Sequence, residues 1–391
     1  MCSARALATF SARIERNAVM LKRFVTILLL AAALLTLGGC GSIFEQEYWS
    51  AHPYEEPENT DADDTTEIHN YTGLLRALNA MVAGYETERV LVFGDYSGII
   101  GDDLATACWE VRSNTAIGAY CVEAITYETE QVVAYCEADV TITYKRTADE
   151  VKSIYSAQTR NGIIESVVDV LDAQRTTFAI QINTDALDDS DVSTLVETAC
   201  LNHPMLAVDI PRMDITMYTG GTNQRIFEIT LRYSATQNEI SEWRAALDTK
   251  LQALTGTLDG DAQDAALQAC AVTAEACSMN GTSGSTAYHA LVEGSTDSRG
   301  LAMAYKAMCD VLEIPCQVVA GRFDSVEHYW NIVQIGGKYY HLDLAGYSGT
   351  VWLQRDSDIW GRYWWDAESY PVCESQGFSW KPGQRLVLPE E

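Results

Sequence analysis

The C-terminal part of this chain contains the sequence His328-Tyr-Trp-Asn-Ile-Val-Gln-Ile-Gly-Gly-Lys-Tyr-Tyr-His-Leu-Asp343, whose pattern is informative about its fold. Two runs rich in β-branched and aromatic residues, 328–335 and 338–344, flank the dipeptide Gly336-Gly337. Such runs are typical of strands, and a two-residue glycine connection favours a tight turn between antiparallel strands. The stretch therefore predicts a β-hairpin.

The turn fixes which residues of the hairpin face each other. Pairing around it sets Ile335 opposite Lys338 and Trp330 opposite Asp343. His328 then lies diagonally across from Asp343 on the same face, within side-chain reach. A His and an Asp held together on a rigid hairpin can serve as the base and the orienting acid of a nucleophilic triad.

A helix is predicted upstream of the hairpin, with Ser298 at its start. Its end is set by Pro315, which cannot continue a helix, and a strand over 316–322 follows. A helix N-terminus stabilises a developing anion, so Ser298 is a candidate nucleophile. Serine is also a favoured N-cap residue, and this alternative stays open. The apolar stripe of the helix has the i, i+4, i+7, i+8 spacing of a buried face: Leu301, Tyr305, Met308, Cys309 and Leu312.

The blocks from Tyr288 to Asp343 resemble the transglutaminase-like superfamily, whose fold is shared with papain-type cysteine proteases. The downstream segments 356–358 (Asp-Ser-Asp) and 370–373 (Tyr-Pro-Val-Cys) are similar to the family as well, so the resemblance covers about 110 residues. It implies a helix packed on an antiparallel sheet, acting on peptide or amide bonds. It places Ser298 where the family has its nucleophilic Cys, and His328 and Asp343 at the catalytic His and Asp. The matching positions are Tyr288, Ala290, Leu291, Val292, Gly294, Gly300, Ala302, Ile314, Cys316, Val319, Gly321, His328, Trp330, Asn331, Gly337, Tyr340, His341 and Asp343.

The serine at position 298 is the main departure from the family pattern. A thiol becomes a thiolate beside a protonated His and a helix N-terminus, whereas a serine hydroxyl must lose its proton during attack. The adjacent Asp297 adds negative charge where an anion would form. The segment 345–347, Ala-Gly-Tyr, also replaces the Thr-Trp that the family has after its Asp.

These departures favour a non-catalytic or degenerate site that binds peptide or protein segments at the cell surface. The first alternative is an active Ser-His-Asp peptidase or acyl transferase. The second is a purely structural module, which a tail (352–380) filling the cleft would favour. In the binding interpretation, Trp330 and Asn331 shape the site, whereas His289 and His341 are predicted to be structural.

The pattern of residues at the N-terminus predicts a targeting signal. Lys22 and Arg23 precede an apolar run over 24–37, which is too short to span a bilayer. The sequence Leu37-Gly-Gly-Cys40 resembles a bacterial lipobox, which implies lipid attachment at Cys40. The alternative is an ordinary signal peptide in which this Cys is incidental. We expect a lipoprotein-type signal over 1–39, an acidic tether over 40–67, and an extracytoplasmic protein anchored to a bacterial membrane. Translation starting at Met20 would give a more typical signal.

The middle of the chain carries a short internal repeat. Leu104-Ala-Thr-Ala-Cys108 recurs 92 residues later as Val196-Glu-Thr-Ala-Cys200, and a strand-like run precedes each copy. We interpret this as a duplicated α+β unit, over 68–160 and 161–256, followed by the transglutaminase-like domain over 262–391. The expected fold class is α+β throughout.

Composition excludes several classes of function. The 391 residues carry a formal charge of −29 with 47% hydrophobic residues, and no basic cluster occurs beyond the N-terminus. A nucleic-acid partner is therefore not expected. The chain has no phosphate loop, zinc motif, dinucleotide fingerprint or calcium-loop spacing, so neither a cofactor nor a metal is expected. Of the 11 Cys, nine remain without Cys2 and Cys40, and most of these lie in apolar runs, which is typical of small buried hydrophobic residues. Disulfides between them are the open alternative.

Overall fold

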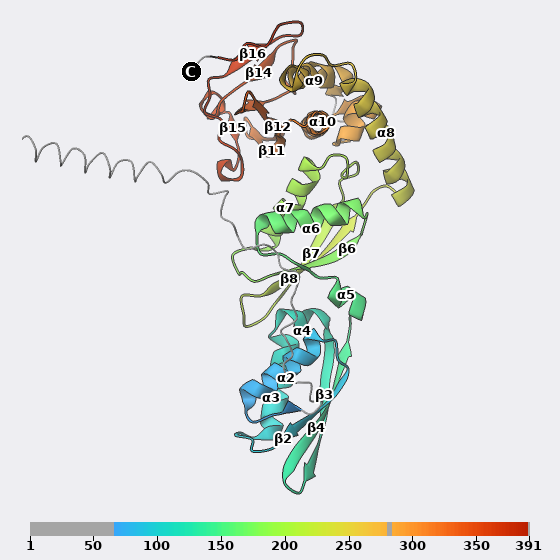
Figure 1. Ribbon diagram of the computed structural model, residues 1–391, viewed down its shortest axis with the longest axis vertical. Helices are drawn as coiled ribbons and strands as arrows, with labels where there is room; N and C mark the ends of the chain where they lie inside the picture. The colour runs from blue at the N-terminus through green and yellow to red at the C-terminus, as the bar shows by residue number, and fades with distance from the viewer. Residues whose placement is uncertain (1–65, 280–283, 390–391) are drawn as a thin grey trace, which may run out of the picture. The chain divides into compact units, whose positions relative to one another are not determined.

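The computed structural model describes residues 66–279 and 284–389 (Figure 1). Helices alternate with sheets that are largely antiparallel, so the chain belongs to the α+β class, as predicted. The predicted signal over 1–39, Cys40 and nearly all of the tether lie outside the described residues. None of the described helices is long and apolar enough to cross a membrane.

The first folded unit is a four-stranded sheet with three helices. Its strand order is β1-β2-β4-β3, with β1 parallel to β2 and the other pairs antiparallel. Leu104 and Cys108, from the repeated pentapeptide, lie on a helix of this unit and are buried in its core. The elements are β1 (Thr66–Glu67), α2 (Tyr71–Ala83), β2 (Glu88–Phe93), α3 (Ile100–Ser113), α4 (Ala116–Cys121), β3 (Val122–Val132) and β4 (Tyr135–Tyr144).

The second unit has the same strand order, β5-β6-β8-β7, again with one parallel pair followed by antiparallel pairs. The second pentapeptide lies on α7, at the position that α3 holds in the first unit. The internal duplication stays a prediction, which this shared order supports. Strand β5 lies upstream of the expected boundary at 160/161. The elements are α5 (Ala148–Lys152), β5 (Tyr155–Ser156), α6 (Arg160–Asp172), β6 (Thr177–Ile182), α7 (Asp189–Asn202), β7 (Arg212–Thr219) and β8 (Arg225–Arg232).

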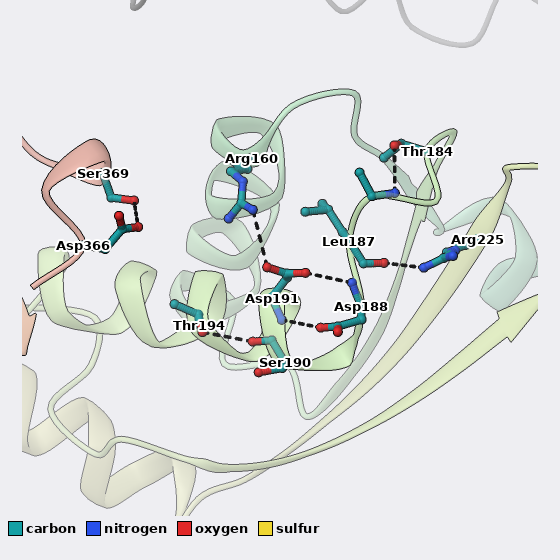
Figure 2. A network of polar contacts seen from close by, with 11 residues as sticks. Arg160, Thr184, Leu187, Asp188, Ser190, Asp191, Thr194, Arg225, Asp366 and Ser369 are labelled. Carbon is teal, nitrogen blue, oxygen red and sulfur yellow. Dashed lines mark hydrogen bonds and ion pairs between the residues drawn. The ribbon is translucent and has the colours of Figure 1, made fainter.

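Local capping fixes the start of α7, as Figure 2 shows. Asp188 Oδ1 accepts a hydrogen bond from the Asp191 backbone N–H at 2.9 Å, and Asp191 Oδ2 accepts one from the Asp188 N–H at 3.0 Å. This reciprocal pair satisfies two backbone donors that the first turn of a helix leaves free. Arg160 at the start of α6 also reaches Asp191 Oδ1, at 3.4 Å.

The C-terminal part is built around one helix on a four-stranded antiparallel sheet of order β13-β12-β11-β15 (Figure 1). The helix α10 packs on the face of β11 and β12, and its predicted apolar stripe contributes to the main core. Helices α8 and α9 pack on the other sides of α10. The elements are α8 (Gln237–Thr255), α9 (Ala262–Ala276), β9 (Ser278–Met279), the π-helical turn η1 (His289–Glu293), β10 (Ser295–Thr296), α10 (Ser298–Val311), β11 (Cys316–Phe323), β12 (Val326–Ile335), β13 (Lys338–Leu342), β14 (Val351–Leu353), α11 (Asp356–Ile359), β15 (Tyr363–Trp364), the 3-10 turn η2 (Ala367–Ser369) and β16 (Phe378–Trp380).

The hairpin has the predicted register. Ile335 pairs with Lys338, and the ladder runs to the pair Asn331 and Leu342. Gly336 and Gly337 have φ values of +63° and +77°, the left-handed conformation that glycine adopts readily and that a two-residue turn of this type requires. Asp343 follows directly after the last ladder pair, which places it beside the start of β12.

The second face of this sheet carries a smaller apolar cluster. Alternate residues of a strand point to opposite faces, so Trp330 lies on the face away from α10. It packs there with Val319, Ile332 and Cys373.

The described residues include nine cysteines, all of them free. Eight are buried, among them Cys373, and Cys277 is partly buried.

Candidate active site

The structure brings His328 and Asp343 together. His328 Nε2 and Asp343 Oδ2 are 2.7 Å apart, and their side chains are only 13% and 17% exposed. Because a carboxylate can only accept, Nε2 carries the proton in this contact and Nδ1 is left for another partner. The Ala345 backbone N–H donates to Asp343 Oδ1 at 2.9 Å, which fixes the carboxylate. This arrangement is that of a base held by an orienting acid.

Tyr363 is a third member of this group, and sequence reasoning missed it. Its hydroxyl donates to Asp343 Oδ2 at 2.8 Å, the same oxygen that contacts His328. Burial, followed by the nearby Asp343 charge, raises the pKa of Tyr363, so its hydroxyl stays protonated. It therefore donates to the Asp343 carboxylate and helps to hold it in place. Tyr363 lies on the two-residue strand β15, which is too short to leave a periodic signal in the sequence.

Aromatic rings enclose His328 on several sides. The Phe323 ring centre lies 5.6 Å from the imidazole, and the Tyr363 and Trp330 ring centres each lie 6.2 Å away. The Trp330 ring is nearly parallel to the imidazole, at 20°. These rings limit the orientations open to His328 and keep water from much of its surface.

A second His–Asp pair lies behind the first and is joined to it through Trp330. Trp330 Nε1–H donates to His341 Nδ1 at 3.0 Å, so His341 must carry its proton on Nε2. That Nε2 lies 2.8 Å from Asp356 Oδ1. Burial lowers the pKa of His341, which keeps it neutral, although Asp356 opposes this shift. Both ring nitrogens are thus occupied, Nδ1 by Trp330 and Nε2 by Asp356, which suits the structural role predicted for His341.

The ligand atoms of His341, Asp356 and Cys373 lie within 4.8 Å of one another, which raises the question of a metal site. Because the Trp330 N–H bonds to His341 Nδ1, the proton of the neutral ring lies on Nε2. A metal at Nε2 would have to displace this proton. Burial also raises the pKa of the Cys373 thiol well above its ordinary value, so the thiolate that a metal needs is disfavoured. In the structure the three residues form a hydrogen-bonded cluster, in which His341 Nε2 contacts Asp356 Oδ1 and the Cys373 backbone N–H donates to the same oxygen at 3.3 Å.

Ser298 is the first residue of α10, and Asp297 is its N-cap. The interpretation of Ser298 as the cap is therefore wrong, because Asp297 Oδ1 is the group that accepts from the Gly300 N–H, at 3.1 Å. Asp297 Oδ2 accepts from Ser285 Oγ at 2.5 Å. Both carboxylate oxygens of Asp297 thus accept hydrogen bonds at the start of α10.

The Ser298 hydroxyl contacts the hairpin through its backbone. Ser298 Oγ accepts from the Tyr329 N–H at 3.3 Å. Within residues 66–279 and 284–389, no hydrogen bond joins Ser298 to His328. The structure thus brings Ser298 to the strand that carries His328 without forming the nucleophile–base contact of a triad.

Asn331 ties α10 to β12 from inside the core. Its Nδ2 donates to the Ala302 carbonyl at 3.0 Å and contacts Cys316 Sγ at 3.6 Å. Its Oδ1 is buried, and none of the described residues donates to it. Asn331 and Trp330 are each 1% exposed, so they shape the site from beneath; direct contact of either with a ligand stays a prediction.

The tail covers one side of the His328–Asp343 pair. Tyr363 contacts both residues, and Trp365 packs on Trp330, with ring centres 6.1 Å apart. Its other tryptophans differ in burial: Trp380 is buried, whereas Trp352, Trp360 and Trp364 are exposed.

Comparison with known proteins gives remote structural similarities only. No known family matches the sequence, and no curated protein matches it. Among solved structures, a protein described as a TGase has a TM-score of 0.26 and 11% identity, covering 53% of this chain and 61% of its own. A candidate cysteine protease from Cytophaga hutchinsonii has a TM-score of 0.24 and 11% identity, covering 46% and 78%.

A candidate protease from Parabacteroides distasonis has a TM-score of 0.21 and 10% identity, covering 56% of this chain and 51% of its own. The chain thus spans less than two thirds of the first and third of these proteins. At such low TM-scores the similarities assign neither a family nor a function, and the α+β class rests on the elements described above.

Proposed function

We propose that the C-terminal domain is a transglutaminase-like module that binds peptide or protein segments at the His328–Asp343 pair without cleaving them. One observation carries the proposal: Ser298 Oγ accepts from the Tyr329 N–H and makes no hydrogen bond to His328 among the described residues. A serine needs a base at its hydroxyl to attack a carbonyl, and no basic side chain among residues 66–279 and 284–389 is hydrogen-bonded to this one.

The second candidate is Ser-His-Asp acyl transfer or peptide hydrolysis. It is favoured by the 2.7 Å contact between His328 and Asp343, with Tyr363 on the same carboxylate oxygen. Nucleophile–base contacts are often long before substrate binds, so a shift of Ser298 toward His328 would complete the site. In that case Ser298 would form an acyl ester and His328 would pass its proton to the leaving amine.

Labelling by a fluorophosphonate probe separates the two candidates. On the binding proposal, the purified protein takes up no label at Ser298, as mapped by mass spectrometry. A Ser298 adduct that disappears in His328→Ala would overturn it in favour of acyl transfer. The Ser298→Ala variant shows which label belongs to other serines.

Peptide binding itself is measured by panning a random heptapeptide display library on the wild type and on His328→Ala. We expect peptides enriched on the wild type to bind His328→Ala about tenfold more weakly, because the exposed edge of the imidazole is lost. Tyr339→Phe, altered on the neighbouring strand, is the matched control and should keep the affinity. An absence of enrichment on the wild type would contradict the proposal.

We also propose that the chain is a lipoprotein attached to a bacterial membrane through Cys40. The lipobox-like sequence 37–40 after a short apolar run supports this assignment. In a bacterial host fed an alkyne-tagged fatty acid, the wild type should carry the tag and sediment with membranes, and Cys40→Ala should lose both. Cys2→Ala is the matched control, and equal labelling of Cys40→Ala would sink the assignment.

A further inference from the structure

A hollow lies beside the site, on the strand next to the one that carries His328. Its volume is about 550 Å³, within the range of small-ligand sites. Gly321, on its floor, is the direct register partner of His328. The lining residues come from β11, the turn after it and the segment around β15: Ala320, Gly321, Arg322, Ser325, Trp364, Trp365 and Asp366.

The floor of the hollow depends on a glycine. A Cβ at Gly321 would lie 2.4 Å from the Trp364 carbonyl oxygen and 2.6 Å from the Trp330 ring. Only a residue without a side chain lets the β15 backbone approach β11 this closely above Trp330. The hollow is therefore a consequence of how β15 joins the sheet.

Two charged residues of the hollow, Arg322 and Asp366, keep hydrogen-bonding groups that no described residue uses. Arg362 nearby is paired with Asp324 at 2.9 Å, whereas Arg322 has no ion pair among the described residues. Asp366 Oδ2 accepts from Ser369 Oγ at 2.6 Å, as Figure 2 shows. No described residue donates to its Oδ1. Both groups therefore keep hydrogen-bonding capacity for a ligand.

An exposed indole completes the hollow. Trp364 is 56% exposed, an unusual position for the largest apolar side chain. Trp365 is partly buried and is fixed by ring contacts to Trp330, His341 and Trp360. One tryptophan thus anchors the segment while its neighbour remains available at the surface.

We propose that this hollow binds a neutral saccharide ring. A sugar hydroxyl can accept from Arg322 and donate to Asp366, and the C–H face of the ring can lie against Trp364. A carboxylate ligand would meet Asp366 and an ammonium ligand would meet Arg322, whereas a neutral polyhydroxylated ring satisfies both. This site goes beyond the proposed peptide binding and does not depend on it.

The test is titration of the full chain with chitotriose, cellotriose and maltotriose, followed by tryptophan fluorescence and calorimetry. We expect saturable binding of at least one of the three. Trp364→Ala and Arg322→Ala should each weaken it about tenfold. Trp352→Ala is the matched control, because Trp352 is equally exposed, at 59%, but lies on β14 outside the hollow.

Three results would overturn the proposal: no binding at millimolar concentrations of any of the three sugars, equal losses in Trp364→Ala and Trp352→Ala, or binding of an acidic hexapeptide in their place. If Trp364→Ala fails to fold by circular dichroism, Asp366→Asn tests the same hollow. His328→Ala should leave sugar affinity unchanged, so a failure here is distinguishable from a failure of the peptide-binding proposal.

Discussion

Asp343 holds the site together because three donors converge on its carboxylate. His328 Nε2 and the Tyr363 hydroxyl share Oδ2, and the Ala345 N–H takes Oδ1. Hydrogen bonds to a charged acceptor are stronger than neutral ones, so each donor contributes to fixing the orientation of the imidazole. The tail residue Tyr363 is therefore part of the site although it lies 20 residues beyond Asp343.

Removing the Tyr363 hydroxyl should lower the stability of the folded chain. We expect Tyr363→Phe to lower the free energy of unfolding by about 1.5 kcal/mol, because one hydrogen bond to a charged group is lost from a half-buried site. Urea unfolding measures the change. Tyr339→Phe is the control, since no described residue bonds its hydroxyl. Equal stability of Tyr363→Phe and the wild type would count against this contact.

Two substitutions of Asn331 with side chains of similar volume should lower the free energy of unfolding by different amounts. Asn331→Asp should cost about 3 kcal/mol or more, because it leaves a charge buried without a cationic partner. Asn331→Leu keeps a similar volume and removes the unpartnered Oδ1, so its cost should stay below about 1.5 kcal/mol. Urea unfolding compares the two, and a larger loss in the leucine variant would contradict the reasoning.

Residues that interact across a turn could be predicted from the sequence, and residues brought together by the whole fold could not. The contact of His328 with Asp343 follows from the Gly336-Gly337 turn, which fixes a local register. The contact of Tyr363 depends on a two-residue strand returning to β11. Nothing local distinguishes that tyrosine from its neighbours.

At the level of elements, the start of α10 shows why the sequence alone could not identify Asp297 as the N-cap. The segment Ser295-Thr-Asp-Ser298 consists only of residues that favour an N-cap, so composition could not select one. Asp297 is selected by tertiary contact, because its second oxygen accepts from Ser285. The helix itself was predictable, since its apolar stripe from Leu301 to Leu312 is periodic over about three turns.

Asp297→Ala should therefore destabilise the domain more than Ser298→Ala. We expect a loss of about 1–2 kcal/mol for Asp297→Ala, because the Gly300 N–H and Ser285 Oγ both lose their acceptor. Ser298→Ala removes only the long contact with the Tyr329 N–H and should cost less. Thermal unfolding of the two variants decides the order, and the reverse order would contradict Asp297 as the cap.

The junction of β11 and β15 makes a second prediction about elements. Gly321→Ala should cost about 1–3 kcal/mol, because the new methyl group would overlap the Trp364 carbonyl and the Trp330 ring. Gly346→Ala is the matched control, since a Cβ there meets nothing within 4 Å. Urea unfolding of both variants is the measurement, and equal stabilities would show that β15 can move away at no cost.

For the whole molecule, the contacts between parts of the chain were beyond sequence reasoning. The Val318 N–H on β11 donates to Asn202 Oδ1 at the end of α7, at 3.0 Å, across 116 residues of sequence. The Tyr329 hydroxyl likewise contacts Glu197 at 3.0 Å. Glu197 belongs to the second pentapeptide, which lies on α7. Its repetition in the sequence gave no sign that it contacts the C-terminal domain.

Buried histidines make the stability of the whole chain depend on pH. Burial lowers the pKa of His341 and of His203, so both are neutral in the folded chain near pH 7. In the unfolded chain each recovers a pKa of about 6.5. Below that value the unfolded chain binds protons that the folded chain does not, so the free energy of unfolding must fall as the pH falls. Asp356 faces His341 and opposes the effect, which makes it smaller than burial alone would give.

Unfolding in urea at about pH 7.5 and about pH 5.5, one unit on either side of that value, measures this loss. We expect the wild type to be less stable at the lower pH, and His341→Gln to show a smaller difference between the two conditions, because it has one fewer group to protonate. His69→Gln, at an exposed position, is the control and should keep the wild-type difference. If His341→Gln kept the full difference, His341 would not be the neutral, doubly bonded ring that positions Trp330, and the link between the two His–Asp pairs would be lost.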